Sequence, residues 1–189
     1  SAASDVYKRQ DVYFAYTFYI RNEGESTVDY LWNLNITQET MNVADAVWAM
    51  VFEDGNMRFY AKAAASGQAE ALPAQSDNTR GYAGLPLQEL APQSDQFEVI
   101  KQVGAITYWR VIPDKFEGDQ RITGGGQSGV DPMEVHKYTV VLWLEGDDPQ
   151  ATDDVIGAHM GVEMNFRLIN EPEKDKSGWK AIFPGWDWL

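Results

Sequence analysis

Apolar and polar residues alternate along several stretches of the chain, with the period of two that is typical of a strand with one buried face. The first such stretch is Val12–Arg21 and the second is Thr27–Thr37, and the short polar segment Asn22–Ser26 lies between them. Their apolar faces are formed by Phe14, Tyr16, Phe18 and Ile20 and by Val28, Tyr30, Trp32, Leu34 and Ile36. Two alternating stretches joined by a short turn predict an antiparallel hairpin.

A second hairpin is predicted around Asp54-Gly55, because this dipeptide suits a turn that needs positive φ angles. Its strands are Val47–Phe52 and Met57–Ala61. Just before them, Asn42 is a candidate N-cap for one helical turn through Val43–Ala46.

Further strands are predicted at Gln96–Val103 and Ala105–Ile112, which Gly104 divides. Glu134–Glu145 is apolar on both faces, so we expect a central strand that is covered on both sides. Ala158–Ile169 is the last clear strand. Its inward-facing residues are expected to be Met160, Val162, Met164, Phe166 and Leu168.

Two long segments lack this periodicity. Lys62–Asp95 is rich in Ala, Gly, Gln, Ser and Pro and predicts a loop, in which Ala61–Ala71 is a helix candidate weakened by Gly67. Pro113–Pro132 predicts a second connection with the flexible triplet Gly124-Gly125-Gly126 at its middle. The triplet lacks the Lys-Ser/Thr ending of a phosphate-binding loop.

These elements predict an all-β protein, an antiparallel β-sandwich of jelly-roll or immunoglobulin-like form with two long loop insertions. We expect a single sandwich domain at 11–170, followed by an aromatic tail at 171–189. Residues 1–10 resemble translated sequencing adapter rather than native protein, so we exclude them from the fold. On this interpretation a signal peptide and a first strand have been lost upstream.

The net charge and the composition of the chain limit the kinds of partner and chemistry that we expect. The chain has 29 acidic and 15 basic residues and a formal charge of -14. Such a surface repels phosphate backbones and anionic lipid, which argues against nucleic-acid binding. The absence of cysteine excludes disulfides, thiolate metal sites and thiol catalysis. No run of 18 apolar residues occurs, so we expect no membrane span.

Carboxylates are densest in the connection after Glu145, at Asp147, Asp148, Asp153 and Asp154. Closely spaced carboxylates suit Ca²⁺, although Pro149 interrupts the spacing of a calcium loop and a solvated, capped turn also fits. The same groups supply the residue types of a glycosidase acid–base pair. No other cofactor is indicated.

Two further features have two interpretations each. His136 and His159 precede or begin strands, and they are either ordinary surface groups or a joint metal site if those strands pair. No Gly-x-Ser-x-Gly nucleophile motif occurs. The C-terminal rings either pack on their own domain or form an interaction surface. The candidate interaction residues are Trp179, Phe183, Trp186 and Trp188.

Tyr13–Gly24, followed by a strand with Tyr30, resembles the opening of the TasA-like and camelysin-like exported proteins of Gram-positive bacteria. Val43–Tyr60 and Lys137–Phe166 resemble secreted relatives of these proteins from gut Firmicutes. The second of these two stretches reads KYTVVLWLEGDDPQATDDVIGAHMGVEMNF. The matches cover roughly half of the chain, and they bring no catalytic residues with them.

The resemblance implies a jelly-roll sandwich, export to the cell surface, and assembly into fibres in which a strand of one subunit completes the sheet of the next. The segment that would donate this strand lies upstream of Tyr13, and Gln150-Ala151 stand where relatives carry Cys. We therefore expect a non-enzymatic surface or matrix protein that binds itself or other surface proteins. A carbohydrate-binding module is the alternative, and a glycan hydrolase that uses the acidic connection is a third.

Overall fold

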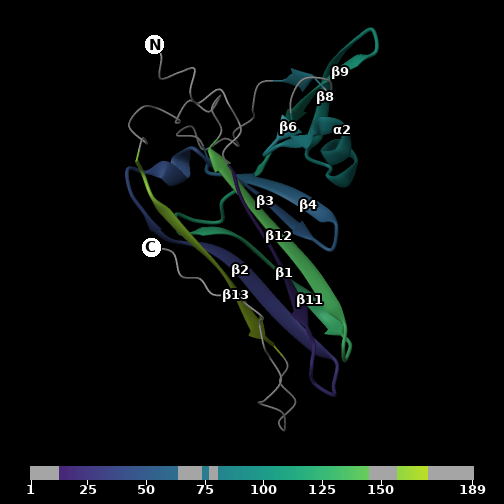
Figure 1. The fold of residues 1–189 in the computed structure, drawn as a ribbon, viewed down its shortest axis with the longest axis vertical. Helices are drawn as coiled ribbons and strands as arrows, with labels where there is room; N and C mark the ends of the chain where they lie inside the picture. The colour runs from purple at the N-terminus through teal and green to yellow at the C-terminus, as the bar shows by residue number, and fades with distance from the viewer. Residues whose placement is uncertain (1–12, 64–73, 77–80, 145–156, 170–189) are drawn as a thin grey trace.

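The computed structural model describes residues 13–63, 74–76, 81–144 and 157–169. In this part of the chain the protein is all-β, with two main sheets packed face to face and only short helical segments (Figure 1). The prediction of an all-β sandwich is confirmed. The described strands pair in antiparallel fashion except for one short parallel contact between β10 and β4.

The larger sheet has the strand order β1-β12-β3-β4-β10. Its strands are β1 (Tyr13–Arg21), β12 (Val135–Leu144), β3 (Val47–Glu53), β4 (Asn56–Ala61) and β10 (Asp114–Lys115). The turn between β3 and β4 has positive φ at Asp54 (50°) and Gly55 (88°), which confirms the predicted Asp-Gly hairpin.

The smaller sheet has the order β11-β2-β13. Its strands are β2 (Val28–Glu39), β11 (Arg121–Val130) and β13 (Met160–Leu168). The predicted flexible linker at Gly124–Gly126 is wrong, because these glycines lie within β11 and pair with β2. A Cβ at Gly125 would lie 2.8 Å from the Trp32 ring, so the missing side chain makes room for the indole.

The predicted hairpin of the first two strands is also wrong. β1 pairs with β12 and β2 pairs with β11 and β13, so the two strands belong to different sheets. Asn22 explains the crossing. Its side-chain amide donates to the carbonyls of Ser26 and Val130, and the Met133 N–H donates to the backbone carbonyl of Asn22. These bonds hold the connection at the β11–β12 turn, where the chain passes between the layers.

Two apolar cores lie on opposite faces of the larger sheet. One fills the space between the sheets and the other lies under the segment that carries β6, β7 and α2. β12 contributes to both, with Val140 facing the first core and Trp143 the second. The prediction that this strand is central and covered on both faces is confirmed.

The segment predicted as one long loop contains short elements. They are β5 (Gln75–Ser76), β6 (Gly81–Tyr82), β7 (Leu85–Pro86), α2 (Leu87–Leu90) and η2 (Ala91–Gln93). The helix α2 buries Leu87 and Leu90 against the second core, which is why it forms where no periodicity predicted a helix. Most of the helix candidate Ala61–Ala71 lies outside the described residues.

Two strands follow this segment, β8 (Phe97–Val103) and β9 (Ile106–Val111), as predicted. The helical turn predicted after Asn42 is present as η1 (Val43–Asp45). Asn42 makes no side-chain cap, however; the Ala44 N–H donates to the Glu39 carboxylate instead.

Candidate functional site at the open side of the sandwich

β1 and β13 are the edge strands on one side of the sandwich, which we call the open side. They belong to different sheets and face each other across the core, where the Phe18 and Phe166 rings meet edge to face with centroids 5.8 Å apart. Among the described strands, β13 pairs only with β2. An edge of this kind presents backbone N–H and C=O groups that a further strand can pair with.

The inward-facing residues of β13 point toward the core but are only half-buried. The five predicted inward-facing residues all pack against the first core, and none of them is fully buried. They are Met160, Val162, Met164, Phe166 and Leu168. The open side therefore combines an edge strand with apolar side chains that further burial would stabilise.

The opposite side, which we call the closed side, is covered by the chain itself. After β10 the chain crosses from the larger sheet to the smaller one and enters β11. Phe116 N–H donates to Ala61 O, and Ile36 N–H donates to Gln120 O. Ile122 is fully buried beneath this crossing. The closed side thus has a hydrogen-bonded chain crossing between the two sheets, whereas no described segment links β1 to β13.

A buried polar network joins the two sheets inside the sandwich. Glu53 Oε1 accepts hydrogen bonds from Tyr138 OH (2.5 Å), Trp32 Nε1 (3.1 Å) and Gln127 Nε2 (3.0 Å). The Tyr30 and Tyr138 hydroxyls are 2.7 Å apart. Burial raises the pKa of Tyr138, and its bond to Glu53 acts in the same direction; burial also raises the pKa of Tyr30. This network satisfies polar groups of the core, which is a structural role.

His136 lies next to this network and fixes the β3–β4 turn. Its Nδ1 lies 2.5 Å from Asp54 Oδ2, while Asp54 Oδ1 accepts the Lys137 N–H at 2.7 Å. His136 pairs with Ile20, whereas His159 donates its N–H to Thr40. The two histidines therefore lie at opposite ends of the sandwich, and the hypothesis of a joint metal site is wrong.

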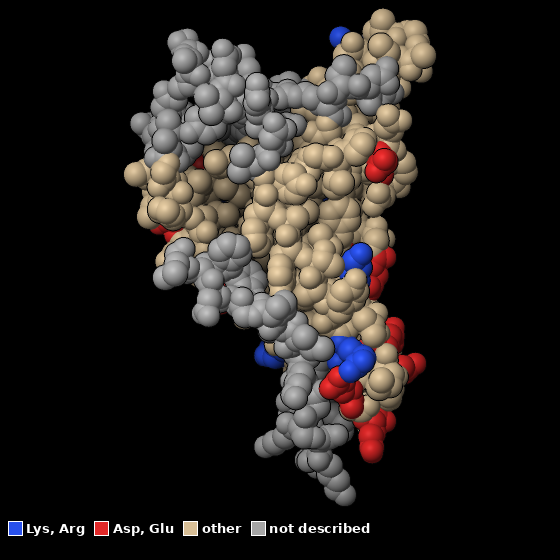
Figure 2. Space-filling view, viewed as in Figure 1, with Lys and Arg blue, Asp and Glu red and all other residues tan. Residues whose placement is uncertain are grey.

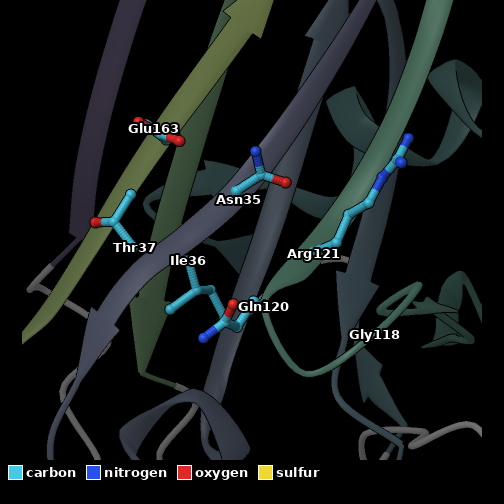
Figure 3. A pocket seen from close by; sticks show the side chains of 7 residues that line it. All are labelled: Asn35, Ile36, Thr37, Gly118, Gln120, Arg121 and Glu163. Carbon is cyan, nitrogen blue, oxygen red and sulfur yellow. The ribbon is translucent and has the colours of Figure 1, made fainter.

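A shallow polar hollow of about 490 Å³ opens beside β2, β11 and β13. Figure 3 shows Asn35, Thr37 and Glu163 around it, with the Arg121 side chain directed away. Arg121 pairs with Glu117 at 2.7 Å, and no aromatic ring lines the hollow. It offers groups that can bind hydroxyls but no ring on which a sugar could stack.

A carbohydrate-binding module would need exposed rings, but three of the four tryptophans in the described part of the chain are buried. Trp32, Trp48 and Trp143 are at most 5% exposed. Only Trp109, on β9, is half-exposed. These four tryptophans pack within or against the two cores, and among the residues described they form no exposed row on a sheet face.

The other predicted site residues lie outside the described residues. This applies to the candidate calcium ligands Asp147, Asp148, Asp153 and Asp154 and to the aromatic tail residues Trp179, Phe183, Trp186 and Trp188. Within the residues that the structure describes, no group of three or more His, Asp or Glu side chains is arranged to hold a metal ion. No helix in that part is long and apolar enough to cross a membrane.

Comparison of the chain with family models, with curated proteins and with solved structures finds no match.

Proposed function

We propose that this chain is a non-enzymatic, exported surface or matrix protein that self-associates by adding a strand at the open side of its sandwich. The observation that carries the proposal is β13, an edge strand whose inward-facing apolar residues are only half-buried. Pairing with a strand from another copy would supply backbone hydrogen bonds and bury these side chains at the same time. The resemblance to exported fibre-forming proteins supports export and assembly.

The proposal is tested by measuring the mass of the chain by light scattering as its concentration rises, with negative-stain imaging of the products. Val162→Lys places a charge on the inward face of β13, a position at which natural edge strands use charges to prevent pairing. It should abolish assembly. Leu31→Lys, at a 40% exposed position on the outer face of the same sheet, is the matched control and should assemble normally.

A chain that remains monomeric at high concentration would overturn the proposal. Equal assembly by Val162→Lys and Leu31→Lys would show that association uses another surface. Circular dichroism of both variants as monomers checks that each one still folds.

Carbohydrate binding is a second candidate function, and the polar hollow is the observation that favours it. Its amide, hydroxyl and carboxylate groups can bind sugar hydroxyls. Asn35→Ala and Glu163→Ala should then weaken glycan binding measured by calorimetry, while Asp119→Ala, at an exposed position that does not line the hollow, should not. Identical binding by all three variants would exclude the hollow as a sugar site.

A further inference from the structure

β8 and β9 form a hairpin, which we call the arm (residues 97–111), that projects from the body at the upper right of Figure 1. Every residue of β8 after Phe97 is exposed. Val99, Ile100 and Val103 are 52%, 40% and 57% exposed. Several large apolar side chains held in water on one short strand mark a contact surface.

The base of the arm is firmly anchored. The Gln96 side chain accepts the Phe59 N–H at 2.6 Å and donates to Phe59 O at 2.9 Å, so it pairs with β4 as a strand would. Ile112 N–H donates to Gln96 O, and the Phe97 ring packs edge to face on Phe59. Because the arm is already held in one direction, a partner would not have to order it on binding.

The outer edge of the arm is chemically suited to another strand. Among the described strands β8 pairs only with β9, whose other edge pairs with β5. The outer edge of β8 therefore presents backbone N–H and C=O groups, with a register shift at Ile100. Hydrocarbon cannot satisfy such groups, so a polypeptide edge matches the arm better than a membrane does.

The charge of the arm is opposite to that of the rest of the chain. The arm contains Lys101, Arg110 and Glu98, a net charge of +1, so the rest of a chain of formal charge -14 carries -15. Glu98 is paired with Arg110 at 2.7 Å, which leaves Lys101 over the Tyr108 ring. Figure 2 shows a basic side chain near the tip of the arm and acidic side chains along the right-hand edge of the body.

From these observations we infer that the arm of one copy adds to the β13 edge of a second copy and covers the half-buried residues of its open side. This inference rests on the proposed function, because it uses the same edge of β13. The exposed apolar strand of the arm and the incompletely covered core beside β13 complement each other, and the arm's charge is opposite in sign to the net charge of the rest of the chain. The two surfaces differ, so the contact is heterologous and can add copy after copy into a filament.

Cross-linking tests the inference, because the chain has no cysteine of its own. Gln102→Cys on the arm and Asn165→Cys on β13 are both at exposed positions. When the two variants are mixed and treated with a short bis-maleimide, we expect at least ten times more covalent dimer than either variant gives alone. Asp119→Cys, an exposed position on the closed side, replaces Asn165→Cys as the control and should give none.

Charge reversal gives a second readout. Lys101→Glu on the arm should weaken association at least fivefold by light scattering, whereas Lys137→Glu at an exposed position on β12 should leave it unchanged. Equal effects of the two variants would overturn the role of the arm's charge.

The outcomes separate the inference from the proposed function. Dimer from Gln102→Cys alone would show that two arms pair with each other and would overturn the inference. Assembly that depends on Val162 but gives no mixed dimer would also overturn it, while strand addition at β13 would stand. A chain that never assembles would overturn both.

Discussion

The closed and open sides of the sandwich are both built from strands with an apolar inner face, but they differ in how the two sheets are connected. On the closed side β10 and β11 carry the chain from one sheet to the other, and Ile122 and Val130 are almost fully buried. On the open side β1 and β13 meet through side chains alone within the described residues. The comparison indicates that the core and the closed side hold the two sheets together. The edge of β13 on the open side is not needed for this, and in our proposal it is the edge used for association.

The largest expected effect concerns the buried network, which holds the sheets together whatever covers the open side. Because the folded pKa values of Tyr30 and Tyr138 are raised, their contribution is fully present below the unfolded tyrosine pKa of about 10 and is lost as the pH rises above it. Unfolding free energy should fall by about 1.4 kcal/mol per pH unit for each tyrosine. Urea unfolding of the wild type and of the double variant Tyr30→Phe/Tyr138→Phe between about pH 9 and 11, a range centred on the unfolded tyrosine pKa, checks this. A slope unchanged in the double variant would contradict it.

The same substitution on the two sides tests the comparison directly. Val130→Ala in β11 removes a side chain that is 2% exposed and should cost about 2–3 kcal/mol. Val162→Ala in β13 removes a half-buried one and should cost about 1 kcal/mol in the monomer. Urea unfolding at low protein concentration measures both. Equal costs would mean that the open side is as well packed as the closed side.

Gly125 of β11 tests how closely the Trp32 ring packs against this strand of the closed side. Gly125→Ala places a methyl group 2.8 Å from the Trp32 ring and should cost about 1–3 kcal/mol. Gly118→Ala meets nothing within 4 Å and serves as the control, with little expected change in thermal stability. If both variants behaved like wild type, the close approach of Trp32 to β11 would be refuted.

The smallest effect belongs to the surface of the closed side. Arg58 Nε lies 2.7 Å from Asp114 Oδ2, an exposed pair that ties β4 to β10. Asp114→Asn should cost about 0.2–1 kcal/mol, and high salt should reduce the difference from wild type. A loss of several kcal/mol would show that ion pairs, rather than burial, keep this side closed.

The sequence predicted where the strands lie in the chain better than it predicted which strands pair with each other. Alternation is a local property, so the strands that became β1, β2, β12 and β13 could be recognised individually. Sheet membership depends on bonds between distant residues, such as that from Asn22 to Val130, and alternation carries no information about them. Two local signals did predict positions within a sheet: the Asp54-Gly55 turn placed β4 beside β3, and the two-sided apolar pattern of β12 predicted its covered position.

The missed elements have identifiable physical causes. β11 has few side chains that could alternate, and the only sequence signal for it was the need of the large Trp32 ring for an empty position opposite. The network around Glu53 was missed because it joins residues from four strands that are distant in the sequence, β2, β3, β11 and β12. Its signal was the presence of Tyr30 and Tyr138 on inward faces, since buried hydroxyls require partners.

The open edge of β13 as a site for another copy is the central claim, and hydrogen exchange tests it most directly. Amide exchange of β13 and β11 should be compared at protein concentrations below and above the onset of assembly. The account predicts that β13 amides exchange at least tenfold more slowly above the onset, as the added strand protects them, while β11 amides remain unchanged. Full protection of β13 at the lowest concentration, or no change on assembly, would contradict it.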